Sequence, residues 1–500
     1  MDERTYLPDR MRAPRGLGRV LVLGLGKSGR GVVEYCLPLM GSRVSGLFVA
    51  AGARGAASEE FAAQARGRGA QVVFGDAAVE ELAGGARFDV CVASPGIPPF
   101  SPLYEAALRL ADEVVSEIEF AWRESAATSR WVAVTGTNGK STVTACTAHV
   151  LAGAGLRASA VGNIGDTCIE AVAAGRTDVY VAEVSSYQLA STRDFAPDVA
   201  VLLGITPDHL HWHGTLEAYR DAKLKVLANL SARPGAVAVL DATNDVVGAE
   251  VRRLQEQGRA CGFAFVPIGT QAGIEKDMRV ALGGGNAAFV GADGALRVAL
   301  GGVEHVLLSA GELQIKGAHN VLNALAVAAA ALAAGVAPEA VSAGLRSFAP
   351  LEHRIEPCGE VRGVRCYNDS KATNVDATLK AIEAFPGSPL LVLLGGDDKG
   401  TDLAPLVAAT HAHARVAVCF GDAGERFAAA FETASANAPE GFALVRAEHL
   451  EDALDAALAL ATPGDVLLLS PACASFDEFT CFEHRGRVFK QLVAQRAARS

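Results

Sequence analysis

Residues 131–142 read Trp131-Val-Ala-Val-Thr-Gly-Thr-Asn-Gly-Lys-Ser-Thr142, and this stretch decides the fold. Its first five residues predict a buried β-strand, a Gly-rich loop follows, and an apolar helix begins at Ser141. Such a loop directs backbone N–H groups and a helix N-terminus at a phosphate, while Lys140 supplies a positive charge and Ser141 a hydroxyl for Mg²⁺. The common phosphate-loop pattern needs Gly where Val134 stands, so this loop is the narrower TGTNGK[ST] variant. A Gly-rich turn that binds nothing is the weaker interpretation, because strand, loop and helix all fall where the motif needs them.

Composition places the chain among globular α/β proteins with more than one domain. Its 500 residues exceed what one hydrophobic core usually serves, and we expect two to four domains. Half of the residues are hydrophobic and 20% are charged. The ten cysteines show no C-x-x-C pairing, which argues against a disulfide framework and for a reducing compartment. Ordinary buried thiols are predicted at Cys36, Cys91, Cys146, Cys168 and Cys419.

The charge balance excludes some classes of partner. The formal net charge is −11 and there is no long basic run, so nucleic acid and anionic membranes are poor candidates. The apolar runs Val20–Leu25 and Val321–Gly335 are too short to span a membrane, and the second predicts a buried core helix. We expect a soluble, cytoplasmic monomer without membrane insertion.

Strands and helices alternate along the chain, which predicts an α/β fold with three domains. The expected domains are a Rossmann-like N-terminal domain (1–121), a P-loop-type central domain (122–349) and a Rossmann-like C-terminal domain (350–500). The first boundary rests on a charged, irregular segment, Trp122–Arg130, and the second on Ala349-Pro350. Residues 270–310 predict a β-hairpin region. The expected strands are Arg19–Leu25, Arg43–Phe48, Gln71–Phe74, Phe88–Ala93, Asp178–Glu183, Asp198–Ile205, Ala236–Leu240, Leu390–Gly395, Val416–Gly421 and Asp465–Ser470.

Two turns in the first third could hold a nucleotide diphosphate. The turn Gly24-Leu-Gly-Lys-Ser-Gly29 follows the first strand, and Ser94-Pro-Gly-Ile97 ends a later one and should face the same crevice. A dinucleotide site also needs an acidic residue near the end of the second strand, and Val44–Phe48 has none. NAD chemistry is therefore disfavoured. Taken alone, the Ser94 turn is as well explained by an ordinary turn.

Further along the chain, a carboxylate stands at the end of a predicted buried strand. Glu183 ends the strand that begins near Asp178, and burying it is costly unless it meets a cation. Mg²⁺ on ATP phosphates is the natural partner, and an ion pair with a neighbouring Arg or Lys is the alternative. The polar loop Gly162-Asn-Ile-Gly165 could present its amide to a phosphate.

Three histidines and one lysine follow the next strand. His209, His211 and His213 alternate along the chain, which disfavours a tetrahedral zinc site because no Cys or Glu completes the set. Asp208 and His209 are better explained as members of a hard-metal and phosphate site. Lys223 is predicted to be helical, and a lone helical Lys is normally a solvated surface residue.

The order of these motifs resembles the Mur ligase family, and the resemblance runs from about residue 19 to residue 490. The downstream motifs are similar to those of its D-glutamate-adding branch. The loop at Asp208 departs from the family pattern, which commonly has Asp where His211 stands, and the second strand lacks the family's usual acid. The motifs that carry the resemblance are TGTNGKS, GNIG, E-x-SSYQL, DH and YRDAK, followed by Lys316–Asn323, His353-Arg354, Asn368–Thr373, Leu393–Lys399 and Leu469–Phe476.

The resemblance implies a role for each matching residue. As catalytic residues it implies Lys140, Glu183, His209 and Lys223. For two Mg²⁺ sites it implies Ser141 with Glu183, and His209 with Lys223 as a CO₂-derived carbamate. For ATP as co-substrate it implies Gly136, Thr137, Asn138, Gly139, Lys140, Ser141, Thr142, Asn320, Asn323, Arg354, Asp369 and Lys371. For the UDP-substrate it implies Gly26, Lys27, Ser28, Ser94, Pro95, Gly96 and Asn163. For D-glutamate it implies Thr373, Lys399, Ser475 and Phe476.

The activity that the resemblance implies is ATP-dependent addition of D-glutamate to UDP-N-acetylmuramoyl-L-alanine through an acyl phosphate, in peptidoglycan precursor synthesis. A sister ligase that adds another amino acid remains the nearest alternative. The GLGKSG domain argues against a folate-type glutamate ligase. A plain P-loop ATPase coupled to partner proteins and an NAD-dependent dehydrogenase are the alternatives from other classes.

Overall fold

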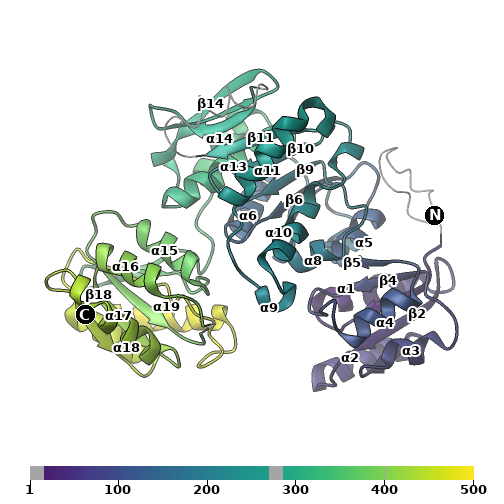
Figure 1. The fold of residues 1–500 in the computed structure, drawn as a ribbon, viewed down its shortest axis with the longest axis horizontal. Coiled ribbons are helices and arrows are strands. Elements are labelled where there is room, and N and C mark those ends of the chain that lie inside the picture. The colour runs from purple at the N-terminus through teal and green to yellow at the C-terminus, as the bar shows by residue number, and fades with distance from the viewer. Residues whose placement is uncertain (1–15, 270–284, 399, 500) are drawn as a thin grey trace. The chain divides into compact units, whose positions relative to one another are not determined.

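A computed structural model describes residues 16–269, 285–398 and 400–499 of the chain, with the side chains of residues 211 and 259 left aside. By internal contacts the chain divides into two compact units. The first comprises residues 1–312 and 322–347, and the second residues 313–321 and 348–500. The described residues form three sheets, of five, nine and six strands, two in the first unit and one in the second (Figure 1).

The N-terminal sheet has the Rossmann half-fold expected from the sequence. Its strand order is β3-β2-β1-β4-β5 and its pairs are all parallel, so each connection crosses over the sheet. Strand β2 extends three residues beyond its predicted end at Phe48, as far as Ala51. The elements are β1 Gly18–Leu23, α1 Lys27–Cys36, β2 Val44–Ala51, α2 Ala56–Gly67, β3 Gln71–Phe74, α3 Ala78–Ala83, β4 Val90–Ala93, α4 Pro102–Leu110, β5 Val114–Ser116 and α5 Glu117–Glu124.

The second sheet has the order β14-β13-β12-β11-β10-β9-β6-β8-β7. It is parallel from β7 to β12 and antiparallel from β12 to β14, which confirms the predicted hairpin region between residues 287 and 309; residues 270–284 lie outside the described range. Its strands are β6 Arg130–Thr135, β7 Ala158–Gly162, β8 Val179–Glu183, β9 Val199–Leu202, β10 Val237–Asp241, β11 Ala264–Gly269, β12 Ala287–Val290, β13 Ala295–Leu300 and β14 Val303–Ser309. Its helices are α6 Lys140–Gly153, α7 Cys168–Ala174, α8 Ser186–Ala190, α9 Leu210–His213, α10 Leu216–Leu224, α11 Asp245–Gln257, α13 Ala318–Ala333 and α14 Pro338–Ser347.

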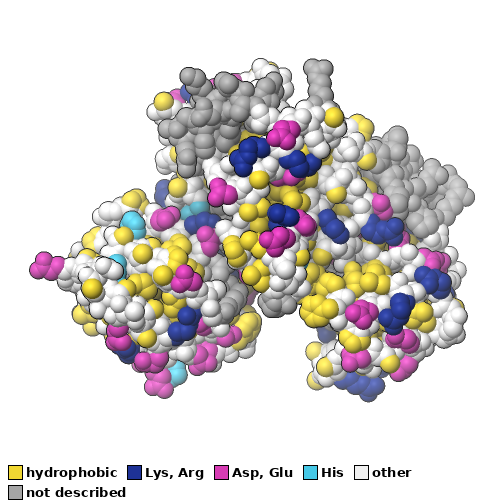
Figure 2. Space-filling model, viewed as in Figure 1, with side chains coloured by type: hydrophobic (Ala, Val, Ile, Leu, Met, Phe, Trp, Pro, Cys, Tyr) yellow, Lys and Arg dark blue, Asp and Glu magenta, His cyan; other side chains and the backbone are white. Residues whose placement is uncertain are grey.

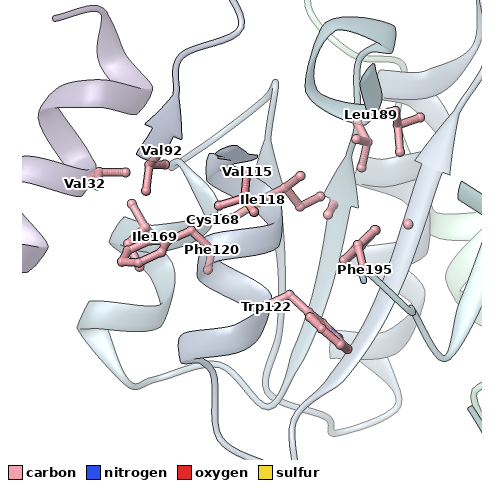
Figure 3. Packing of buried hydrophobic residues seen from close by; sticks show 14 of the residues in the cluster. Val32, Val92, Val115, Ile118, Phe120, Trp122, Cys168, Ile169, Leu189 and Phe195 are labelled. Carbon is pink, nitrogen blue, oxygen red and sulfur yellow. The ribbon is translucent and has the colours of Figure 1, made fainter. Parts of the chain in front are cut away.

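One hydrophobic core serves both sheets of the first unit. Helix α5 is buried along its whole length, and the Trp122 ring packs edge-on against Phe195 at 6.0 Å between centroids (Figure 3). On the other side of the helix, Phe120 lies near Ile169 of α7. The prediction of an irregular segment from Trp122 is therefore wrong for its first three residues, which belong to this helix.

Two buried charged residues of α5, Arg123 and Glu124, have ion-pair partners both within the helix and in other parts of the chain. The Arg123 guanidinium pairs with Glu113 at 2.7 Å, Glu119 at 2.5 Å and Asp194 at 2.8 Å. Glu124 accepts two hydrogen bonds from Arg43. Buried charges of this kind are tolerated when each is paired and hydrogen-bonded.

The second unit holds a six-stranded sheet of order β15-β16-β20-β17-β18-β19, parallel except for the edge pair β15–β16. Apolar clusters cover both of its faces, as a parallel sheet requires. Its elements are β15 Glu356–Val361, β16 Val364–Asn368, α15 Val375–Glu383, β17 Leu390–Gly395, α16 Ala404–His413, β18 Ala414–Phe420, α17 Gly424–Thr433, β19 Ala443–Arg446, α18 Leu450–Leu460, β20 Val466–Leu469 and α19 Phe482–Arg499.

Surface charge, helix hydrophobicity and cysteine burial can be compared with the expectations from the sequence. On the face seen in Figure 2, basic and acidic side chains are interspersed. Among the described residues no helix is long and apolar enough to cross a membrane. The five cysteines predicted to be buried are all buried and free.

Candidate active site

Three strands of the second sheet end side by side, and the loops after them form the candidate site. Register pairs Val134 of β6 with Glu183 of β8 and Thr135 with Leu202 of β9. The loop 136–139, the Glu183 carboxylate and the Asp208–His209 segment therefore emerge at one edge of the sheet. This edge is the carboxyl end of the strands, where parallel α/β sheets bind ligands.

The loop after β6 needs glycine at two positions. Gly136 has a φ of 146°, and a Cβ there would lie 2.6 Å from the Cβ of Leu203. Gly139 has a φ of 83°, and a Cβ there would lie 2.5 Å from Oδ1 of Asn323. Helix α6 begins directly after it, at Lys140. Backbone N–H groups at this helix N-terminus are suited to a phosphate.

Lys223 of α10 contacts the same loop. Its side chain is only 1% exposed, and Nζ donates a 2.7 Å hydrogen bond to the Gly136 carbonyl oxygen. Burial, followed by the nearby charge of Lys140, lowers the Lys223 pKa well below its ordinary value. The neutral amine is therefore favoured far more than in water. The expectation for a lone helical Lys, a solvated surface position, does not hold here.

Glu183 brings a carboxylate with one unsatisfied oxygen into this cluster. The side chain is 2% exposed; Oε1 accepts a 2.9 Å hydrogen bond from Nδ2 of Asn163, and Oε2 is buried with no hydrogen-bond partner among the described residues. The alternative of a direct ion pair with Arg or Lys finds no support in the described contacts. A buried carboxylate oxygen beside the hydroxyl-bearing Ser141 loop offers the hard oxygen ligands that Mg²⁺ prefers. These donors fit a magnesium ion.

Asp208 and His209 stand next to each other at the third strand end. His209 has a left-handed backbone (φ 54°), its N–H donates to Oδ1 of Asp208 at 2.8 Å, and Nε2 lies 3.6 Å from Oδ2. The His213 ring nitrogen Nε2 hydrogen-bonds with Ser186 Oγ at 2.9 Å. Tyr187 covers His209 with 5.0 Å between ring centroids.

The N-terminal turns form a separate cleft in the first unit. Its volume is about 530 Å³. The turn after β1 and the Ser94–Ile97 turn after β4 line it, as predicted, together with Ala51 at the end of β2 and Gly52 and Ala53 after it. The extended end of β2 still carries no acid. The cleft lining includes Gly26, Lys27, Ser28, Ser94, Pro95 and Gly96.

Lys27 connects this cleft with the GNIG loop. Its Nζ donates to the carbonyl oxygen of Gly165. In the same loop, the Asn163 N–H donates to the Glu183 carbonyl at 3.0 Å, besides the side-chain bond already described. The cleft, the GNIG loop and the buried carboxylate are thus joined by contacts within one compact unit.

In the second unit, three motif loops leave adjacent strand ends. Register pairs Leu469 of β20 with Asn368 of β16 and with Leu393 of β17. The loops that follow Asn368, Gly395 and Leu469 therefore share one edge. Asp397 and Ala474 join two of them through a pair of backbone hydrogen bonds of 3.0 and 2.9 Å.

Asp369 is a buried carboxyl at this edge. It accepts from Ser470 Oγ at 2.8 Å and from the Ile355 N–H at 3.2 Å. Burial dominates over these bonds and raises its pKa to about 7. Lys371 extends over the ring of Phe482, 3.8 Å from its centroid.

The remaining predicted residues occupy varied positions. Ser475 is buried and Thr373 half-buried, whereas Phe476 is 70% exposed. Lys399 lies outside the described residues. Asn323 lies against Gly139 in the first unit. Asn320 and Arg354 belong to the second unit, where Asn320 donates to the Lys316 carbonyl at 2.7 Å.

Sequence reasoning missed several residues at these edges. Tyr219 is buried, and its hydroxyl hydrogen-bonds with Thr137 Oγ1 at 3.0 Å, beside the phosphate loop. The YRDAK pattern that contains it indicated a role only for the lysine. Phe482 and Arg485 begin α19, beyond the last motif quoted, and both contact the loop after β16. No spacing signal marks them.

A carboxylate–histidine cluster in the second unit already holds a cation. Glu352, His353 and Glu356 lie close enough together to ligate a metal ion. Lys490 Nζ, however, donates to Glu352 at 2.7 Å and to Glu356 at 2.8 Å. The ammonium therefore neutralises the two carboxylates, and this cluster is a structural ion-pair network.

Parallel sheets with a phosphate loop and buried polar groups at their carboxyl ends define a nucleotide-binding α/β protein. Two family models match the chain, the Mur ligase middle domain over residues 134–331 and the Mur ligase, glutamate ligase domain over residues 353–473. Among solved structures, the UDP-N-acetylmuramate–alanine ligase of Thermotoga maritima has a TM-score of 0.55 at 18% identity, covering 96% of this chain and 100% of that one. A pseudomurein peptide ligase type C from Methanothermus fervidus gives 0.54 at 15%, covering 95% and 99%.

Relatives at higher identity span most of the chain. A UDP-N-acetylmuramoylalanine–D-glutamate ligase of Koribacter versatilis is 36% identical over 485 residues, 96% of this chain and 98% of its own length. The proteins of the same name from Alkaliphilus metalliredigens and Solibacter usitatus are 37% and 39% identical, covering 83% and 81% of this chain and 85% and 84% of their own lengths. The chain belongs to the Mur ligase family, together with these UDP-N-acetylmuramoylalanine–D-glutamate ligases.

Proposed function

We propose that this protein is an ATP-dependent ligase that joins D-glutamate to UDP-N-acetylmuramoyl-L-alanine. An oxygen of the alanyl carboxylate attacks the γ-phosphorus of ATP, and the bond to ADP breaks, which gives an acyl phosphate. The amine of D-glutamate then attacks the acyl carbon, phosphate leaves, and the amine loses its proton. The product is an amide, ADP and phosphate, formed in the cytoplasm during peptidoglycan precursor synthesis.

The observation that carries this proposal is the contact of buried Lys223 with the Gly136 carbonyl, next to the unsatisfied Glu183 oxygen. Phosphoryl transfer needs positioning and charge neutralisation more than covalent help from the protein. A phosphate loop flanked by one buried amine and one buried carboxylate supports that task. Lys140 and the loop amides of Gly136–Thr142 would hold the β- and γ-phosphates, with Asn323 against the loop.

We assign two magnesium positions to this cluster. Ser141 and Glu183 would hold one ion, and His209 with Lys223 as a carbamate the other. A neutral amine is the form that reacts with CO₂, and the lowered pKa of Lys223 favours that form. The carbamate turns a cation into an oxygen ligand, which gives this lysine a reason to lie beside Mg²⁺. Bound Mg²⁺ would supply charge neutralisation at the transferring phosphoryl group.

The UDP-substrate would occupy the N-terminal cleft. Gly26, Lys27 and Ser28 stand at the start of α1, where backbone N–H groups suit a diphosphate. Ser94, Pro95 and Gly96 line the same cleft from the turn after β4. Asn163, already bonded to Glu183, would contact the same substrate nearer the carboxylate that is activated.

The second unit would supply the remaining contacts, assigned from its motifs. Asn320, Arg354, Asp369 and Lys371 would contact ATP. Thr373, Lys399, Ser475 and Phe476 would bind D-glutamate, with Lys399 facing the side-chain carboxylate. Replacing Lys399 by Ala should raise KM for D-glutamate. If the contact is desolvated, the substitution should cost about 2–5 kcal/mol of binding free energy. An unchanged KM would remove Lys399 from the site.

Amino-acid dependence of phosphate release tests the whole proposal. The full chain is mixed with ATP, Mg²⁺ and UDP-N-acetylmuramoyl-L-alanine, and D-glutamate, L-glutamate, L-lysine or diaminopimelate is added separately. Release that requires D-glutamate supports the proposal. Release that follows another amino acid assigns the chain to a sister ligase, and release without any amino acid makes it a plain ATPase.

A further inference from the structure

Arg485 is a fully buried guanidinium that joins two motif loops of the second unit. Its Nε donates to Ser370 Oγ at 2.9 Å and one Nη2 hydrogen to the Ser370 carbonyl at 2.8 Å. The other loop receives bonds at the carbonyls of Cys473, at 3.0 Å, and Ala474, at 2.9 Å. Four of the five N–H groups of the guanidinium are used in this way.

A third loop is pressed against the same side chain. Gly396 follows β17, and a Cβ added there would lie 3.0 Å from Nη1 of Arg485. The loops after β16, β17 and β20 therefore meet around one guanidinium. The planar fork of N–H groups allows one side chain to donate to carbonyls of two loops at fixed angles.

No carboxylate balances the charge of Arg485 at close range within the described part of the chain. It has no ion pair there, and Asp369, Asp477 and Glu478 act on it only through longer-range Coulomb interactions. Burial lowers its pKa to about 10, which still leaves the group charged at neutral pH. The guanidinium is thus held at this edge by loop carbonyl groups and not by an ion pair.

We propose that Arg485 is the positioning residue of the amino-acid site: it holds the loops after β16, β17 and β20 in register. This inference rests on the proposed function, since these loops carry Thr373 and Ser475. Arg485 itself does not touch the amino acid. Its effect reaches the ligand through the backbone of Ser370 and Ala474.

The test compares Arg485→Lys with Arg487→Lys in the full chain. Arg487 lies on the same helix and is exposed, so it controls for a lost guanidinium on α19. The first substitution would keep the charge but lose the fork. KM is measured separately for the amino acid, ATP and the UDP-substrate, with kcat and the thermal midpoint. We expect the amino-acid KM to rise on the order of tenfold to a hundredfold, because misplacement by about 1 Å has effects of this size. The UDP-substrate KM should change less than about twofold, and the ATP KM should rise by a smaller factor than the amino-acid KM, since Asp369 and Lys371 flank Ser370.

Two further measurements keep the outcome decisive. Ser370→Ala, which removes one acceptor of the guanidinium, should shift the amino-acid KM in the same direction by a smaller factor. If the lysine variant folds poorly, Arg485→Ala is assayed with added guanidinium chloride, which should restore the amino-acid KM at millimolar concentration.

An unchanged amino-acid KM in the lysine variant would overturn the proposal, and so would a parallel rise of all three KM values. A third contrary result would be an Arg485→Ala protein whose stability and amino-acid KM are not both restored by guanidinium. A wild-type protein that responds to an amino acid other than D-glutamate would refute the proposed substrate alone. The same comparison would then be made with the amino acid that does drive phosphate release.

Discussion

Nζ of Lys223 lies 2.7 Å from the carbonyl oxygen of Gly136. This contact joins helix α10 to Gly136, the first residue of the phosphate loop, and the two residues are 87 positions apart in the sequence. Among the described contacts, the amine at this place is neither solvated nor held in a direct ion pair with a carboxylate. Its environment is that of a buried lysine with a lowered pKa, held against the phosphate loop.

Replacing Lys223 by Ala should lower kcat by on the order of a hundredfold or more, because an electrostatic group beside the reacting phosphates is lost. Added acetate or formate should recover part of the activity by occupying the place of the carbamate. Phosphate release is the measurement. Lys225→Ala, two residues on and bonded to the Ala190 carbonyl, is the control and should stay near wild type. Full unaided activity of the Lys223 variant would disprove the metal-bridging role.

Glu183→Gln should separate stability from activity. Removing an unpaired buried charge is expected to leave the thermal midpoint unchanged or raise it, while the Mg²⁺ concentration needed for half-maximal phosphate release increases. Asp178→Asn is the control, at the exposed position just before the same strand, where it pairs with Arg157. A fall in thermal midpoint without any change in Mg²⁺ dependence would mean that Glu183 is a structural carboxylate.

Gly136→Ala should destabilise the first unit by about 1–3 kcal/mol, since the new methyl group meets Leu203 and the backbone φ is positive. ATP binding, measured by calorimetry, should be lost or strongly weakened. Gly153→Ala at the end of α6 meets open space and should be neutral or stabilising by up to about 1 kcal/mol. Equal effects of the two substitutions would contradict the steric argument.

Asp369 should make stability depend on pH. Its folded-state pKa is raised to about 7, so the folded state binds a proton that the unfolded chain has lost. The resulting stabilisation is complete below the ordinary carboxyl pKa near 4 and is lost as pH rises through about 7. In Asp369→Asn this contribution should vanish, and the fall in unfolding free energy between pH 5 and 8 should shrink by at least about 1 kcal/mol. Denaturant titrations at the two pH values measure it. Identical pH slopes would show that the carboxyl is not protonated in the fold.

Much of the fold could be predicted because strand ends and Gly-rich turns are local signals. The phosphate loop, the parallel N-terminal sheet and the hairpin region all followed from apolar runs and turn residues. The end of β2 was placed too early, at Phe48 instead of Ala51, because the small residues that follow carry little strand signal. Helix α5 was missed in part since Arg123 and Glu124 are charged, and their partners Asp194 and Arg43 are far away in sequence.

Some residues of the candidate site could likewise be predicted from local sequence signals, and others could not. Glu183 and Asp208 could be placed from the strands that precede them. Lys223 gave no such signal on its own, and only its burial against Gly136 distinguishes it from a surface lysine. The sequence did not indicate Arg485, because its hydrogen-bond acceptors are mostly backbone carbonyls of loops, and the carbonyl of Ser370 is more than 100 positions away. Every residue has a backbone carbonyl, so such acceptors produce no sequence pattern.

Residues from both sheets of the first unit enclose helix α5, and this limits where the chain can be divided into fragments that fold. A fragment ending at residue 121 would divide this helix and omit Trp122, which packs against Phe195. An isolated substrate-binding module made for screening or fragment soaking should therefore extend through the second sheet. We expect its shortest workable form to be residues 1–347, which contain the whole first unit, and calorimetry of that piece should give a single cooperative melting transition.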